Sequence, residues 1–260
     1  MTDSYEFFKN RILLLTGIDL NAYKEKQMKR RIDTLIERHS FDNYEDYVVS
    51  ITNDKDLYEE FVNYLTINVS EFYRNPLQWD ILEKTILPEL IFRFGTALKV
   101  WSAACSTGDE PYSLVMSMSR LISIDHIKVY ATDIDKQVLG LAKDGIYNTR
   151  SIANVPADMK SLFFNQVSDN EYEISGRIKR RVEFHEQNLL SDLYPQSQHL
   201  IVCRNVLIYF TEEAKDEVFK KFYSALAPGG ILFIGSTEQM INYKSVGFER
   251  VDSFFFRKPL

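Results

Sequence analysis

The sequence predicts an α/β protein in which a small helical domain precedes an open, mostly parallel sheet. Residues 1 to about 70 carry apolar side chains at helical spacing and contain no convincing strand. From about residue 98 onward, short apolar runs alternate with helical segments, which is typical of parallel βαβ units. The 260 residues with 45% apolar content are enough for a small and a medium-sized core.

The helical part is divided by turn and capping residues. Gly17 and Asp19 interrupt the first helix, residues 40–43 the second and residues 52–54 the third. We therefore place a helical domain and its linker at residues 1–72 and the sheet domain at residues 73–260.

In the sheet domain, a helix is expected over Trp79–Pro88, before the alternation of strands and helices begins. Strands are expected at Lys99–Ala103, Lys128–Thr132, Val182–Gln187, Leu200–Cys203 and Ile231–Ile234, and helices at Glu110–Ile122, Lys136–Lys143 and Glu212–Leu226. Residues 248–257 are expected to form two short strands at a sheet edge. Residues 148–181 depart from the alternation and form an insertion, in which Tyr172–Lys179 resembles a hairpin around Ser-Gly.

The overall charge argues against a broad electrostatic attraction to nucleic acids or anionic membranes. Lys and Arg total 31 against 37 Asp and Glu, a net charge of −6. The amino terminus lacks the features of a signal peptide, and no apolar run approaches the ~18 residues that span a bilayer. We expect a cytoplasmic protein that does not insert into a membrane.

Cysteine and histidine usage indicates neither a disulfide framework nor a metal site. Cys105 and Cys203 are interpreted as free thiols, and the four histidines lack metal-ligand spacing. We therefore assign no metal.

A basic cluster stands out in the helical domain. Its positive residues are Lys24, Lys26, Lys29, Arg30 and Arg31. A solvated helix face explains such a run as well as a docking face for an acidic partner does. Both interpretations remain open.

Polar residues at the ends of several predicted strands indicate a ligand site. In a doubly wound sheet the ligand lies across the carboxyl ends of the strands. The loop after the first strand has one glycine, Gly108, which disfavours a pyrophosphate cofactor, and Asp133 follows it by 25 residues, where an acid can accept ribose hydroxyls. S-adenosylmethionine fits better than a dinucleotide, although Asp133 is equally explained as a helix cap.

The linker upstream of the sheet supplies further polar groups. Asn68, Ser70 and Arg74 offer an amide, a hydroxyl and a guanidinium within seven residues, which suits a segment folded over a ligand. Ordinary capping explains Asn68 and Ser70 equally well. Arg74 is less easily explained by capping.

Four ordered motifs span most of the chain: Asn68-x-Ser70-x-Phe72-Tyr73-Arg74, Ser102–Ser113, Ala131–Asp135 and Cys203-Arg204-Asn205-Val206-x-Ile208-Tyr209-Phe210. Together they resemble the CheR-type chemotaxis receptor methyltransferases. The resemblance implies a small helical domain, a class I S-adenosylmethionine-dependent methyltransferase domain with a Rossmann-like sheet, and a small antiparallel β subdomain inserted in the latter.

The resemblance also implies which residues carry the function. The cofactor contacts fall on Asn68, Ser70, Arg74, Glu110, Asp133, Asn188, Leu189, Arg204 and Asn205, and the catalytic candidates are Arg74 and Tyr209. Ser70 stands where threonine is common in the family and keeps the hydroxyl. Asp109 stands where glutamate is usual, while the neighbouring Glu110 is intact.

The implied activity is methylation of specific glutamate side chains in the cytoplasmic methylation region of membrane-bound chemotaxis receptors. The products would be glutamate methyl esters and S-adenosylhomocysteine. We expect a monomer that binds no nucleic acid. A nucleic-acid methyltransferase is disfavoured because strand four ends in Arg-Asn-Val-Leu-Ile-Tyr-Phe. A non-catalytic S-adenosylmethionine sensor or adaptor, or a methyltransferase for another substrate, remains the alternative.

Overall fold

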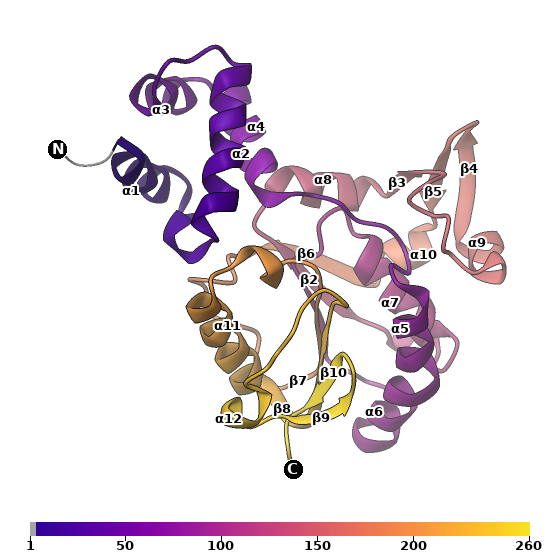
Figure 1. Cartoon of the computed structure of the whole chain (residues 1–260). Helices are drawn as coiled ribbons and strands as arrows, with labels where there is room; N and C mark the ends of the chain where they lie inside the picture. The colour runs from indigo at the N-terminus through magenta and orange to yellow at the C-terminus, as the bar shows by residue number, and fades with distance from the viewer. Residues whose placement is uncertain (1–3) are drawn as a thin grey trace. The chain divides into compact units, whose positions relative to one another are not determined.

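The computed structural model describes residues 4–260, which contacts divide into two units (Figure 1). The first unit runs to Asn68 and also includes Tyr209–Glu217. The second unit contains Val69–Ile208 and Val218–Leu260. Each unit is described separately below.

The first unit is helical. Its elements are α1 (Ser4–Thr16), η1 (Leu20–Ala22), α2 (Glu25–Arg38), α3 (Tyr44–Asn53) and α4 (Lys55–Thr66). The side chains of Asn43 and Asp54 accept hydrogen bonds from backbone N–H groups at the starts of α3 and α4, as N-caps do. The rings of Phe8, Tyr47 and Phe61 meet in the core of this unit. The helical character and the predicted interruptions are confirmed.

The segment Tyr209–Glu217 contacts this first unit, although in sequence it lies between two stretches of the second unit. The backbone N–H of Lys24 donates to the carbonyl of Tyr209 at 2.9 Å. Tyr23 and Phe210 form an isolated antiparallel bridge, and their rings meet edge to face at 5.1 Å. Two aromatic rings and a short strand-like pairing therefore hold this segment against the turn before α2.

The second unit is built on a seven-stranded sheet. Its strands, in spatial order, are β6 (Val182–Glu186), β2 (Val129–Asp133), β1 (Val100–Ala103), β7 (Gln198–Cys203), β8 (Leu226–Ile234), β10 (Phe255–Arg257) and β9 (Glu249–Asp252). The first five strands are parallel, and β10 and β9 close the edge antiparallel. The predicted α/β class, its five strands and the edge pair at residues 248–257 are confirmed.

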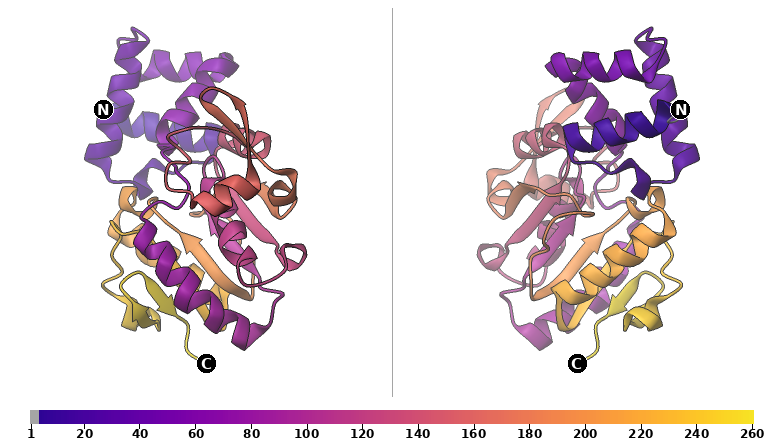
Figure 2. Two further views of the ribbon diagram at one scale, coloured as in Figure 1. Left: turned by 90° about the vertical axis from the view of Figure 1, so that its right-hand side faces the viewer. Right: turned by 90° about the vertical axis from the view of Figure 1, so that its left-hand side faces the viewer.

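Helices cover both faces of this sheet. The unit contains α5 (Pro76–Ile81), η2 (Leu82–Ile86), α6 (Leu87–Phe94), α7 (Asp109–Ser119), η3 (Ile124–His126), α8 (Lys136–Asp144), the end of α11 (Glu212–Ala225) and α12 (Tyr243–Val246). Figures 1 and 2 show α6 and α7 on one face and α11 on the other. Trp101 in β1 packs on Phe222 of α11, with ring centroids 5.5 Å apart.

A second, smaller sheet lies within the sheet unit. It contains β3 (Ile146–Asn148), β5 (Glu171–Ile174) and β4 (Phe164–Ser168), all antiparallel, with α9 (Ala157–Phe163) and α10 (Gly176–Lys179) beside them. An inserted antiparallel β subdomain is therefore present, and its first strand begins two residues before the expected start at residue 148.

The expected hairpin at Tyr172–Lys179 is wrong. The hairpin joins β4 to β5 through Asp169 and Asn170. A Ser-Gly hairpin turn would require a left-handed φ, whereas Gly176 lacks one, and the Ser175 carbonyl instead accepts from the N–H of Lys179 in a helical turn. Ser-Gly therefore begins α10.

Candidate functional site

The carboxyl ends of β1, β2, β6 and β7 meet at one edge of the sheet, where the sequence predicts the ligand. Unusual backbone conformations are concentrated near this edge: the residues with positive φ include Tyr73, Asn75, Ala104, Ser106 and Asn205. Non-glycine residues in this region store strain, which is commonly found at functional sites. The loops at this edge therefore have backbone conformations that are unfavourable without the contacts that hold them.

Asp133 at the end of β2 fixes the loop that follows β1. Its Oδ2 accepts from the N–H of Ser106 at 2.8 Å, and its Oδ1 accepts from the N–H of Asp135 at 3.0 Å. Burial raises the pKa of Asp133 to about 6, and the backbone hydrogen bonds oppose this rise. Asp135, not Asp133, caps α8. Because each carboxylate oxygen has a second acceptor position, Asp133 can still accept from a ribose.

Glu110 and Arg204 form a buried ion pair at the same edge. Glu110 lies in the first turn of α7, and its Oε2 is 3.5 Å from Nη1 of Arg204. Its Oε1 accepts from the hydroxyl of Ser102 at 2.8 Å. Burial raises the pKa of Glu110, while Arg204 and then Ser102 lower it. The pair thus places two charges where solvent screens them little.

Arg204 also holds the linker that carries Arg74. Its Nη2 donates to the Arg74 carbonyl at 2.6 Å, to Asn75 Oδ1 at 3.1 Å and to Gln78 Oε1 at 2.7 Å. The indole N–H of Trp79 donates to the same Arg74 carbonyl at 3.0 Å. Two donors therefore fix the Arg74 backbone on the sheet domain without involving its side chain.

The beginning of the linker is held by other contacts. Ser70 hydrogen-bonds the side chain of Asp109, whose Oδ2 also accepts from the hydroxyl of Thr107 at 2.6 Å. Burial raises the pKa of Asp109 to about 6, and the hydrogen bonds from Thr107 and Ser70 oppose this rise. The Ser70 hydroxyl thus hydrogen-bonds a buried carboxylate instead of capping a helix.

Phe72 ties the linker to the inserted sheet. Its ring meets Tyr147 of β3 and Phe164 of β4 edge to face, at 4.7 and 5.2 Å. Its backbone N–H donates to the Ser151 carbonyl at 3.0 Å. Tyr147 in turn donates its hydroxyl to the carbonyl of Thr107 at 2.7 Å, so one tyrosine joins the insertion, the linker and the loop after β1.

The loop after β6 carries Asn188 and Leu189. Asn188 Oδ1 accepts from the N–H of Leu190 at 2.9 Å, and the carbonyl of Leu189 accepts from the Tyr194 hydroxyl at 2.7 Å. The ammonium group of Lys221 in α11 donates to the Leu189 and Leu190 carbonyls at 3.0 and 3.2 Å. This loop is thus held from two sides at the same edge of the sheet.

The structure brings most of the predicted site residues to this edge. Within the second unit, contacts join Ser70, Arg74, Glu110, Arg204 and Asn205 to the ends of β1, β7 and β8. Asn68 and Tyr209 belong to the first unit; Asn68 Nδ2 donates to the Thr66 hydroxyl at 2.9 Å. Their roles at the site stay predictions.

Sequence reasoning missed Glu238. This carboxylate follows the end of β8 by four residues and is 5% exposed. It accepts from the N–H groups of Val206 and Leu207 at 3.0 and 2.8 Å and from that of Gly235 at 2.7 Å. An acid just past the carboxyl end of the next parallel strand is the signal that would have found it, by the rule already applied to Asp133.

The basic cluster on α2 divides into two groups. Lys24, Lys26 and Arg30 are exposed. Lys29 donates to Asp33 and to the Tyr44 hydroxyl, at 2.9 and 2.8 Å, and those two contacts raise its pKa. Arg31 donates to the Tyr64 carbonyl. Only the exposed three are available to a partner without rearrangement of this unit.

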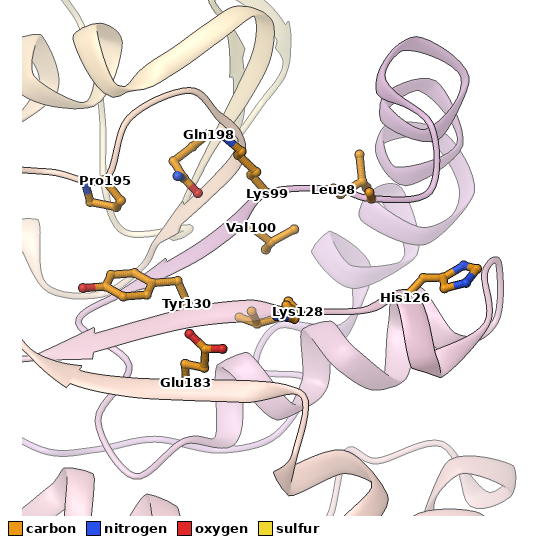
Figure 3. A pocket seen from close by; sticks show the side chains of 11 residues that line it. Leu98, Lys99, Val100, His126, Lys128, Tyr130, Glu183, Pro195 and Gln198 are labelled. Atoms are coloured by element: carbon orange, nitrogen blue, oxygen red, sulfur yellow. The ribbon is translucent and has the colours of Figure 1, made fainter.

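A cavity of about 330 Å³ lies at the opposite edge of the sheet (Figure 3). It is lined at the amino ends of β1, β2, β6 and β7, with Lys99, Lys128, Tyr130, Glu183 and Gln198 among its side chains. None of the predicted site residues lines it. In a parallel sheet the ligand edge is the carboxyl one, so this cavity is not the cofactor site.

The thiols of Cys105 and Cys203 are free and buried, as predicted. Burial raises the pKa of both thiols well above the usual range, which keeps them protonated. Within residues 4–260, no group of three or more His, Cys, Asp or Glu side chains is arranged to hold a metal ion. No helix in the same range is long and apolar enough to cross a membrane.

Comparison with known families decides the chemistry of this edge. Residues 68–253 match the family described as "CheR methyltransferase, SAM binding domain", and residues 3–66 match "CheR methyltransferase, all-alpha domain". The chain belongs to the CheR methyltransferase family. The class I methyltransferase fold and S-adenosylmethionine as cofactor follow from this membership.

Curated CheR relatives match nearly the whole chain. A chemotaxis protein methyltransferase of Listeria monocytogenes is 39% identical, over 98% of this chain and 97% of its own length. Chemotaxis protein methyltransferase 2 of Vibrio cholerae is 32% identical over 92% and 86%, and a chemotaxis protein methyltransferase of Borreliella burgdorferi is 30% identical over 89% and 86%. This chain is therefore a CheR-type methyltransferase of the chemotaxis system.

The residues at the carboxyl edge fit the chemistry of S-adenosylmethionine. The cofactor presents an ammonium, a carboxylate and ribose hydroxyls, for which Glu110, Arg204 and Asp133 are complementary groups. Arg204 Nε and Gln78 Nε2 are buried and make no hydrogen bond within residues 4–260, so polar hydrogen-bonding capacity remains at this edge. The donor set thus suits the cofactor that the family binds.

Proposed function

We propose that this enzyme transfers the methyl group of S-adenosylmethionine to glutamate side chains of chemotaxis receptors, forming methyl esters. One observation carries the proposal most directly: Arg204 binds both the Glu110 carboxylate and the Arg74 carbonyl. Arg204 thereby connects Arg74, which we propose orients the substrate, to Glu110, which we propose binds the cofactor. The relatives named chemotaxis protein methyltransferases support the substrate class.

Within this proposal the cofactor-binding residues are Asn68, Ser70, Arg74, Glu110, Asp133, Asn188, Leu189, Arg204 and Asn205. Bound S-adenosylmethionine supplies an electrophilic methyl group on a positively charged sulfur. Asp133 accepts from the ribose, and Glu110 pairs with the cofactor's ammonium group. Because Asp133 and Glu110 are buried, their interactions with a bound ligand are weakly screened.

The proposed reaction requires orientation more than acid–base catalysis. A glutamate with its usual pKa of about 4.3 is already an anion at pH 7, so no side chain has to remove a proton. Arg74 and Tyr209 are proposed to hold the carboxylate oxygen that is not methylated. A charge-assisted hydrogen bond from Arg74 fixes the direction of approach, which is catalysis by proximity.

The direct test is incubation of the enzyme with methyl-labelled S-adenosylmethionine and receptor-containing membranes. Base-labile label on the receptors is expected, since glutamate methyl esters hydrolyse in alkali. Tight cofactor binding with no label on receptors would contradict this function and favour a sensor or adaptor. Alkali-stable label would indicate another acceptor group.

A further inference from the structure

Glu238 lies where the end of β8 meets the turn that follows β7. Its carboxylate accepts three backbone hydrogen bonds, two from Val206 and Leu207 on one oxygen and one from Gly235 on the other. The side chain is nearly inaccessible, with 5% of the residue exposed. The single carboxylate of Glu238 thus connects the loop after β7 to the end of β8 by hydrogen bonds.

The neighbouring glycine is required for this junction. A Cβ added at Gly235 would lie 2.8 Å from Oε2 of Glu238 and 3.0 Å from the backbone nitrogen of Asn205. Oε2 of Glu238 is held by its hydrogen bond from Gly235, and the other atom belongs to the backbone, so neither gives way easily. Only a glycine therefore lets the end of β8 approach the turn that carries Asn205 so closely.

Asn205 itself has an unfavourable backbone conformation. Its φ is 62°, in the left-handed region that non-glycine residues seldom occupy. Its amide Nδ2 lies 3.3 Å from the hydroxyl of Thr237, one residue before Glu238. Two of the three hydrogen bonds that Glu238 accepts come from the N–H groups of Val206 and Leu207. They hold the chain directly after the strained residue Asn205.

A carboxylate is the group that this geometry requires. All three donors are N–H groups, so every contact needs an acceptor. A glutamine of the same shape would present its NH₂ group to at least one N–H, which replaces a hydrogen bond by a repulsion. An unmade hydrogen bond in a buried position costs more than the bond contributes when it is made.

We propose that Glu238 is a positioning residue that holds the Asn205 turn in the conformation that binds the cofactor. Glu238 acts through the backbone of the turn, whereas Asn205 contacts the ligand. The inference rests on the proposed role of Asn205 in cofactor binding. It extends the set of functional residues to the end of β8, which supplies none of the predicted cofactor contacts.

The test measures binding of S-adenosylhomocysteine by calorimetry to the full chain and its Glu238→Gln variant. We expect affinity to fall by about tenfold or more, from the loss of one or two buried hydrogen bonds to a charged acceptor. The matched control is Glu89→Gln, since Glu89 in α6 also accepts charged contacts, from Arg257 at 2.7 Å, away from the strand ends that carry the site. Its affinity should stay within about twofold of the wild type.

A double-mutant cycle separates positioning from general loss of structure. Asn205→Gly retains the left-handed backbone but removes the amide. If Glu238 acts through this turn, the effect of Glu238→Gln on affinity shrinks in the Asn205→Gly background. Additive effects, or an unchanged affinity of Glu238→Gln, would overturn the inference. Because binding alone is measured, failure of the enzyme to methylate receptors would contradict the proposed function and leave this test intact.

Discussion

Glu110 Oε2 and Arg204 Nη1 lie 3.5 Å apart, with side chains only 12% and 2% exposed. Burial raises the pKa of the Glu110 carboxyl and lowers that of the Arg204 guanidinium, although each group opposes the shift of the other. Both shifts have the direction that desolvation imposes. Each charge thus depends on the other, because removing one partner would leave the other buried and uncompensated.

Replacing Glu110 by glutamine should lower both stability and binding. The substitution leaves the Arg204 guanidinium buried without its carboxylate partner, so we expect the unfolding temperature to fall. Affinity for S-adenosylhomocysteine should fall by about tenfold or more, because a charge-assisted contact with the ligand is lost. Thermal unfolding and calorimetry measure the two effects. A marked loss of stability with full affinity would show that Glu110 serves the fold instead.

Arg74→Ala should reduce turnover by about a hundredfold or more, because the substrate carboxylate loses its orientation. The variant loses the hydrogen bond from Arg74 Nη1 to the Val69 carbonyl at 3.0 Å. The Arg74 carbonyl keeps its two donors, Arg204 and Trp79, so the variant should retain part of the cofactor affinity. Methylation of receptor membranes and calorimetry give the two readouts. Arg74→Lys is the matched control for charge without the planar guanidinium. Wild-type turnover in Arg74→Ala would rule out the proposed role.

The buried carboxyl of Asp109 should make stability depend on pH. Its pKa is about 6 in the fold against an ordinary 3.8, so folding becomes less favourable as the pH rises from about 4 to 6 and the group ionises. Oδ1 makes no hydrogen bond within residues 4–260, and Oδ2 can be replaced by an amide oxygen. The effect of Asp109→Asn on the free energy of unfolding should therefore be more favourable at pH 8 than at pH 4, by about 2 kcal/mol.

Urea unfolding of the wild type and Asp109→Asn at both pH values measures this difference. The control is Asp158→Asn, because Asp158 is exposed and paired with Arg120, and its pKa is lowered by that contact. The control should not gain stability at high pH. An equal change at pH 4 and pH 8 in Asp109→Asn would contradict the assignment of a raised pKa.

If α2 docks on an acidic partner, Arg30→Glu should weaken association with receptors, more at low than at high salt. Arg30 is the better choice than Lys29, which is bound to Asp33 and Tyr44 within its own unit. Lys55→Glu on α4 makes the same charge change on another helix and serves as the control. If Arg30→Glu and Lys55→Glu bind receptors equally well, the basic residues of α2 form a solvated surface and not a docking site.

The sheet was predictable because its signals are local. Apolar runs such as Lys99–Ala103 end at polar loops, and the alternation with helices fixes the parallel order. The hairpin prediction was wrong because Ser-Gly is equally suited to begin a helix, and only the pairing of β5 with β4 across the turn at Asp169 and Asn170 decides between the two. Local sequence does not contain that information.

The candidate site was predictable where a residue directly follows a strand, as with Asp133 and Arg204. Glu238 has a local signal in its place just past β8, but the partners of its carboxylate lie in another loop and depend on the order of strands in space. The partners of Arg74 were unpredictable for the same reason, since Arg204 lies 130 positions away. Sequence indicates the donors and acceptors, while the tertiary fold pairs them.

Tyr147 has a consequence for exchanging parts among related proteins. It belongs to the inserted sheet, yet its hydroxyl hydrogen-bonds the Thr107 carbonyl and its ring meets Phe72 of the linker. The insertion is therefore not an independent module that can be cut out or replaced by a foreign one. A chimaera that transplants another chain's insertion without a tyrosine at this position loses the hydrogen bond to the Thr107 carbonyl in the loop after β1.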